Sequence, residues 1–94
     1  MDKKTADFYV RLKDELEDST SWPSEYLYKF IVPTSKDKID KIEIAFDNMG
    51  AVIQTHASKT GKYTSVSIQV VMENPTQVIA KYQELATIEG IISL

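Results

Sequence analysis

The segment 63–72 is the strongest constraint that this sequence places on its fold. It follows Gly61, and it alternates aliphatic side chains with mostly polar ones over nearly its whole length. Such alternation is typical of a strand that buries one face and exposes the other. We therefore expect a long strand that sends its aliphatic side chains into the core, while Ser65 and Ser67 lie on the exposed face.

The remaining hydrophobic periodicities predict six further elements. In chain order we expect a helix over 5–18, a strand over 25–32, a helix from Thr34 or Ser35 to about Asn48, strands over 51–57 and 63–72, a helix that starts after Asn74 and ends before Gly90, and a strand over 91–94. Without the first helix, this β-α-β-β-α-β order predicts a ferredoxin-like α+β fold, in which a four-stranded antiparallel sheet carries two helices on one face. The first and third strands are expected at its centre.

A chain of 94 residues is long enough for one core only, so we expect a single domain over 1–94. Residues 1–21 form an N-terminal helix and linker, and residues 22–94 form the ferredoxin-like core. The helix has a narrow apolar stripe that includes Phe8, Leu12 and Leu16. We expect this stripe to cover the sheet face that the other helices leave open; docking on a second chain is the alternative.

Lys29 determines which sheet face is open, because an unpaired ammonium is costly to bury. The side chains that alternate in phase with Lys29 should therefore be the less buried ones, and Tyr26 and Tyr28 should point into the core. The face expected to be open consists of Leu27, Lys29, Ile31, Ser65, Ser67, Gln69 and Val71.

Composition excludes several classes of function. The chain has no cysteine, a single histidine (His56) and a formal net charge of −3 without a basic cluster, so we expect no metal site, no cofactor and no nucleic-acid partner. The loop 33–36 lacks the arginine that a phosphate-cradling site would need, and the lone His56 has no carboxylate at local spacing. We therefore expect no catalytic residues and no enzyme. No apolar run reaches the roughly 20 residues of a membrane span, and we expect a cytoplasmic protein with no membrane contact.

Three short motifs resemble the small bacterial YbeD-like family of unknown function: residues 28–31 (YKFI), 58–68 (SKTGKYTSVSI) and 82–85 (YQEL). The resemblance covers residues 22–94. The sequence departs from the family pattern at Thr60, which is inserted between the lysine and the glycine of the hairpin. The resemblance implies a ferredoxin-like domain similar to ACT regulatory domains, with no established catalytic activity.

The resemblance to ACT domains leads us to expect a regulatory or protein-interaction module. Its partner would be another protein or a second copy of the chain, and a small-molecule effector remains a further alternative. The expected contact surface is the open sheet face with the hairpin tip, and its candidate residues are Lys29, Lys59, Lys62, Ser65 and Ser67. The alternative function is a small-ligand or anion sensor, in which Lys59 and Lys62 flank a backbone nest at the tip.

Overall fold

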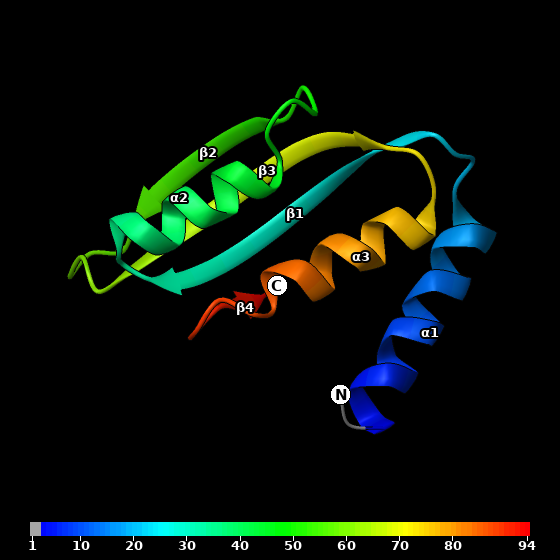
Figure 1. Ribbon diagram of the computed structural model, residues 1–94, viewed down its shortest axis with the longest axis horizontal. Helices are drawn as coiled ribbons and strands as arrows, with labels where there is room; N and C mark the ends of the chain where they lie inside the picture. Colours follow the sequence, from blue (N-terminus) through cyan, green and yellow to red (C-terminus); the bar gives the residue numbers. More distant parts are fainter. Residues whose placement is uncertain (1–2) are drawn as a thin grey trace.

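The computed structural model describes residues 3–94 as one antiparallel sheet and a layer of helices (Figure 1). The elements are α1 (Lys3–Ser19), β1 (Ser24–Pro33), α2 (Lys36–Ala45), β2 (Val52–Ala57), β3 (Tyr63–Met72), α3 (Pro75–Leu85) and β4 (Ile92–Ser93). Their order and type confirm the predicted fold class.

The sheet has the strand order β2-β3-β1-β4, so β1 and β3 are central as predicted. These two strands pair along their whole length, from Ser24 opposite Met72 to Pro33 opposite Tyr63. β4 is much shorter and pairs only with the end of β1. The sheet is therefore built on a long central pair, with β2 and β4 at its two edges.

Two polar caps position the helices that cover the sheet. Ser35 caps α2 by accepting a hydrogen bond from the Lys38 N–H at 3.4 Å. Asn74 caps α3 in the same way at 2.8 Å from the Gln77 N–H, and the Gln77 side chain reaches back to the Glu73 N–H at 2.6 Å. Such caps satisfy N–H groups that have no partner within the first helical turn. Both starts agree with the sequence prediction.

The end of α2 differs from the prediction, since the helix stops at Ala45 instead of continuing to about Asn48. Asn48 adopts a left-handed backbone conformation with φ of 61°, and Gly50 follows with φ of 69°. A residue with positive φ cannot continue a right-handed helix. The segment 46–50 is consequently a turn that leads into β2.

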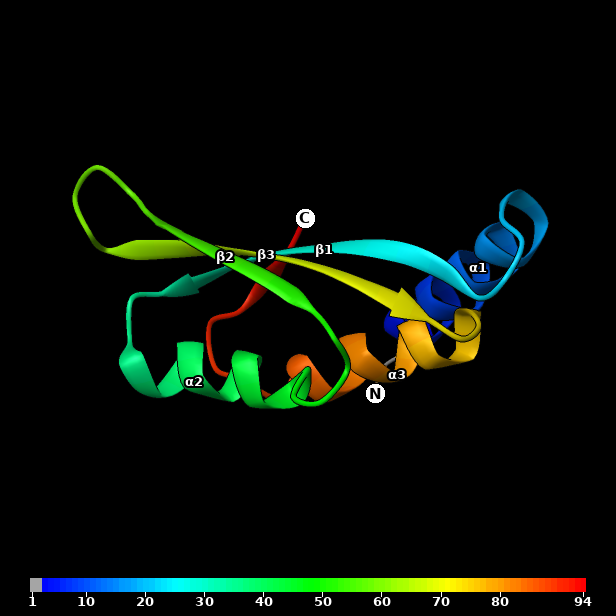
Figure 2. The ribbon, with the colours of Figure 1, turned by 90° about the horizontal axis from the view of Figure 1, so that it is seen from above.

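Helices α2 and α3 lie on the same face of the sheet, and the opposite face carries no helix (Figure 2). The core between the two layers contains an aromatic cluster centred on Tyr28, whose side chain is fully buried. The Tyr28 ring centroid lies 4.7 Å from that of Tyr26, 4.9 Å from Tyr82 and 5.2 Å from Phe46. The cluster thus joins β1 to both helices.

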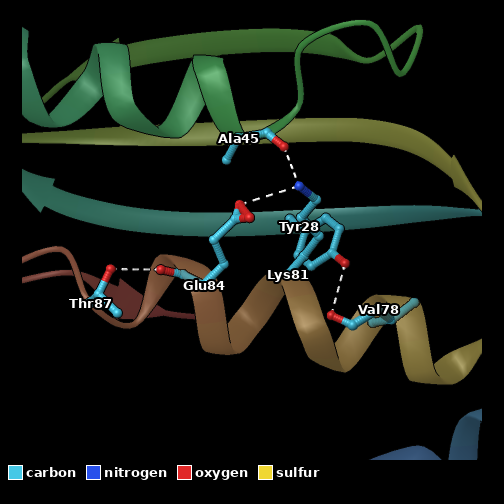
Figure 3. A network of polar contacts seen from close by, with 6 residues as sticks. All are labelled: Tyr28, Ala45, Val78, Lys81, Glu84 and Thr87. Carbon is cyan, nitrogen blue, oxygen red and sulfur yellow. Dashed lines mark hydrogen bonds and ion pairs between the residues drawn. The ribbon is translucent and has the colours of Figure 1, made fainter.

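Lys81 on α3 fastens the two helices to each other (Figure 3). Its ammonium donates to the carbonyl of Ala45 at the end of α2, lies 3.2 Å from Glu84 Oε2, and sits 5.5 Å from the centroid of the Phe46 ring. A cation at a helix C-terminus interacts favourably with the unpaired carbonyls there. This contact holds the end of α2 against α3.

The prediction that the N-terminal helix covers the open sheet face is wrong. α1 packs against α3 instead, beside the end of the helix layer where α3 begins (Figures 1 and 2). The Trp22 indole N–H donates to the Leu16 carbonyl at 3.1 Å and ties the linker to the helix. A hollow of about 250 Å³ remains between Phe8 and Leu12 of α1 and the Tyr26–Tyr82 pair. The apolar stripe on α1 therefore faces the helix layer, and the open face is left uncovered.

Candidate functional site

The sheet face opposite the helices carries more than half of the exposed large hydrophobic side chains of the described chain. We call this surface the open face. Five of the nine exposed large hydrophobic side chains among residues 3–94 lie on it: Leu27, Val52, Tyr63, Val71 and Ile92. Leu27 and Val71 are 52% and 58% exposed. Scattered apolar residues are ordinary on a protein surface, whereas a gathering on one face is typical of a contact site.

A row of side chains crosses the middle of the open face. Gln69 on β3 lies between Leu27 on β1 and Val52 on β2, and Ser67 lies between Lys29 and Gln54 in the next such row. A shallow hollow of about 330 Å³ is lined by Leu27, Lys29, Val52, Gln54, Ser67 and Gln69. The surface therefore combines apolar patches with amide and hydroxyl groups and one ammonium.

Three of the five candidate residues come together on this face, as the alternation predicts. Lys29 lies directly opposite Ser67, and Ser65 is next along β3, where its hydroxyl donates to the His56 carbonyl at 3.2 Å. Lys59 and Lys62 are exposed at the tip of the β2–β3 hairpin, beyond the ends of both strands. The expected surface thus divides into the open face and a separate tip.

The sequence reasoning missed the contribution of β2 to the open face. Val52 and Gln54 belong to it because Ile53 packs against the core, which fixes the phase of the strand. The alternation of Val52, Ile53 and Gln54 indicated a strand. Because the strand is mostly polar, its sequence did not show which of the two alternating sets of side chains faces the core.

The hairpin tip uses most of its own N–H groups. Ser58 N–H donates to the Tyr63 carbonyl at 2.8 Å, and Gly61 N–H donates to the Ser58 carbonyl at 3.0 Å. Side-chain oxygens accept the next two, from Lys62 N–H to Thr60 at 3.5 Å and from Tyr63 N–H to Ser58 at 3.2 Å. A backbone nest binds an anion through N–H groups that have no other partner. The lysine ammoniums are therefore the main feature that the tip offers to an anion.

Three tyrosines that pack in or against the core have hydroxyl groups that bond within the protein. Tyr28 donates to the Val78 carbonyl at 3.0 Å, and the Tyr26 and Tyr82 hydroxyls lie 2.8 Å apart (Figure 3 shows the first of these bonds). Burial raises the pKa of Tyr28 well above its usual value, with a smaller contribution from Tyr26. Burial, followed by the hydrogen bond to Tyr26, raises the pKa of Tyr82 in the same direction.

These raised pKa values predict that the fold loses stability in alkali. The unfolded chain releases its tyrosine protons near pH 10, whereas the folded chain retains those of Tyr28 and Tyr82. The free energy of unfolding should therefore be insensitive to these groups below about pH 10 and should fall as the pH rises above it. Urea unfolding between about pH 7 and pH 11.5 measures the fall. The fall in the free energy of unfolding should be shallower in Tyr28→Phe and in Tyr82→Phe than in the wild type. Tyr63→Phe, at an exposed position, is the control and should show the wild-type fall. Equal slopes in the wild type and all three variants would contradict the assignment.

The described residues contain no group of three His, Asp or Glu side chains arranged to hold a metal ion. Within the same part of the chain, every helix is too short or too polar to cross a membrane.

The β-α-β-β-α-β order, its sheet order and its single helix-covered face define a small ferredoxin-like α+β domain. The chain belongs to a family described as "Protein of unknown function (DUF493)", whose model matches residues 17–94. The UPF0250 protein PM1928 of Pasteurella multocida is 32% identical in a match that covers 87% of this chain and 92% of that protein. These matches confirm the resemblance to the YbeD-like family.

A solved structure supports the fold independently. The solution structure of protein HP0495 from H. pylori superposes with a TM-score of 0.66, covering 87% of this chain and 92% of that one at 14% sequence identity. At this identity the likeness bears on the fold alone.

Proposed function

We propose that this protein is a non-enzymatic regulatory module that binds a protein partner through its open face. The observation that carries the proposal is the gathering of exposed apolar side chains, Leu27 and Val71 among them, on the one sheet face that no helix covers. Burying such side chains against a partner would stabilise the complex by roughly 25 cal/mol for each Å² of apolar area removed from water. The face is therefore suited to association.

The side chains of the open face indicate what kind of partner surface would complement it. Lys29 is the one charged side chain that lines the central hollow, and the amides of Gln54 and Gln69 line it as well. A matching surface would present apolar side chains toward Leu27 and Val71, with a carboxylate within reach of Lys29. A carboxylate facing Lys29 would contribute to specificity and association rate through electrostatic complementarity.

A catalytic role has less support from the same residues. His56 is exposed on β2, and the Ser65 hydroxyl next to it bonds to the His56 backbone carbonyl rather than to the ring. A general acid or base needs a second group that orients it or shares its proton. We therefore assign no reaction to this protein.

Site-specific crosslinking in cells tests the proposal. A photo-reactive amino acid at Gln69, in the middle of the open face, should crosslink to a defined partner, while the same group at the exposed Gln83 on α3 should not. Leu27→Asp should abolish the Gln69 crosslink and leave the melting temperature nearly unchanged, because Leu27 is half exposed in the free protein. Crosslinks that persist in Leu27→Asp, or that are the same from Gln83, would refute a role for the open face.

The anion sensor remains the alternative function, and its support is the pair of exposed lysines at the hairpin tip. A thermal-shift series with phosphate, nucleotides and amino acids addresses it directly. Ligand at 100 times its Kd stabilises the folded state by about 2.7 kcal/mol. A ligand-induced rise in melting temperature that disappears in the double variant Lys59→Ala/Lys62→Ala would favour anion sensing over partner binding at the open face.

A further inference from the structure

β2 is an edge strand whose outer side has no partner among residues 3–94. The Ser58 N–H donates to the Tyr63 carbonyl, so Ser58 belongs to a hydrogen-bonded pair of the β2–β3 ladder. Such pairs alternate along an antiparallel ladder. The N–H and C=O groups of Ile53, Thr55 and Ala57 therefore point away from β3, along a free edge.

This edge lacks the charges, prolines and bulges that keep many edge strands from pairing. The sequence of β2 is VIQTHA, which contains no lysine, no acidic residue and no proline. Its register with β3 runs without interruption from Val52 to Ala57, so it has no bulge. Edge strands of monomeric proteins are usually protected by such charges, prolines or bulges. An unprotected edge is typical of a strand that pairs with another one.

Opposite charges lie at the two ends of this edge. Glu43 and Asp47 on the α2 side flank the start of β2, where they line a hollow with Ala51 and Ile53. Lys59 and Lys62 follow the other end of the strand. None of these four charged groups forms an ion pair within the described chain, whereas the lysines at positions 36 and 41 are paired on α2.

We propose that β2 is a self-association edge, at which two copies of this chain pair antiparallel across a two-fold axis. An antiparallel pair places the start of one β2 beside the end of the other. The acidic end of each copy then meets the lysines at the tip of its partner, at both ends of the interface. Because the interface is isologous, every favourable contact away from the two-fold axis occurs twice. The proposal concerns a different surface from the open face and does not depend on it.

The outward groups select the register. When the axis passes through Thr55, that residue faces the partner's Thr55 and Ile53 faces the partner's Ala57, so all three outward residues of each copy form backbone hydrogen bonds. In this register Lys59 lies opposite the partner's Ala51, next to the acidic end of that copy. Paired threonines across two antiparallel strands are themselves favourable. The result is one continuous sheet through both copies.

A contact of this size predicts a weak dimer. One short strand per copy buries less than the roughly 1,200 Å² that stable interfaces exceed, which suggests a Kd of about 10–100 µM. The exposed charge pairs should weaken with salt, since screening reduces interactions between solvated charges. Sedimentation velocity between about 10 µM and 1 mM protein covers the range.

Charge exchange at the two-fold axis tests the proposal. Thr55→Glu and Thr55→Lys each place like charges opposite each other, and each should weaken the dimer at least tenfold, so that the Kd rises to about 0.1–1 mM or above. An equimolar mixture of the two should associate again, because a glutamate then faces a lysine. Thr55→Val, which keeps the strand propensity without a charge, should still dimerise, as should Leu27→Asp on the open face.

Amide hydrogen exchange gives a second readout that needs no variant. Exchange of the Ile53, Thr55 and Ala57 amides should slow as the protein concentration rises, while the Val52 and Gln54 amides, which bond to β3, should not change. Wild-type protein that stays monomeric at 1 mM would overturn the proposal. A dimer that tolerates Thr55→Glu, or two single-charge variants that do not recombine, would overturn it as well.

Discussion

Tyr28→Ala is expected to lower the free energy of unfolding by about 4 kcal/mol, as truncations of large buried aromatic side chains do. The Tyr28 side chain is fully buried, and its ring touches Phe30, Phe46 and Tyr82. Its removal would leave a cavity bounded by β1 and both covering helices, which cannot all close on it. For a domain of this size the melting temperature should fall by roughly 15–30 °C.

Two further variants separate packing from hydrogen bonding at this position. Tyr28→Phe keeps the ring and removes only the bond to the Val78 carbonyl, so it should cost about 1 kcal/mol. Tyr63→Ala on the exposed side of β3 should cost clearly less than Tyr28→Ala. Denaturant unfolding of the three proteins measures the differences. If Tyr28→Phe were as damaging as Tyr28→Ala, the hydroxyl rather than the ring would hold the cluster together.

The sequence predicts the central strands well because their side chains leave little choice. Residues 63–72 form a strand with the predicted limits, and the phase inferred from Lys29 places Tyr28 in the core and Ser65 and Ser67 outside it. The helix starts at Ser35 and Asn74 were also predictable, because a capping side chain acts on N–H groups only a few residues away. Local chemistry and burial agree at all of these positions.

The position of α1 could not be read from the sequence in the same way. An amphipathic pattern shows that a helix has a face to bury, but it does not say on which surface. The open face and the side of α3 both offered apolar contacts, and in the structure α1 packs against α3, with the Trp22 indole bonded to the Leu16 carbonyl. The contribution of β2 to the open face was not predicted for a related reason, because its side chains are mostly exposed on both faces of the sheet.

The position of α1 bears on both proposals. Because the helix lies beside α3, it covers neither the open face nor the β2 edge. If two copies pair through β2, their open faces join across the new strand pair, and Val52 of each copy comes to lie near the middle of a surface twice as wide. A partner that binds the open face would then find two equivalent sites side by side, which raises the apparent affinity of a bivalent partner.

Gly90→Ala is expected to be the second most damaging of these changes, with a loss of about 3 kcal/mol. Gly90 leads into β4 with φ of 80°, a conformation that costs an L-residue about 1–2 kcal/mol. A Cβ atom there would also lie 2.8 Å from Pro33 Cγ and 3.0 Å from Pro33 Cδ, at the end of β1. The proline ring is rigid, so relief requires β4 to move away from β1, at a cost of about 1–3 kcal/mol for overpacking.

Gly61→Ala is the matched control, because it shares the backbone strain without the clash. Gly61 has φ of 75° at the hairpin tip, and no atom lies within 4 Å of the Cβ that alanine would add. Its substitution should cost only about 1 kcal/mol. The difference between the two variants in denaturant unfolding therefore reports the contact of Gly90 with Pro33 alone.

Amide exchange of Leu94, whose N–H donates to the Lys29 carbonyl at 2.9 Å, should accelerate in Gly90→Ala and not in Gly61→Ala. Equal losses of stability in the two variants would mean that β4 yields freely, and that the last strand contributes little to holding the edge of the sheet.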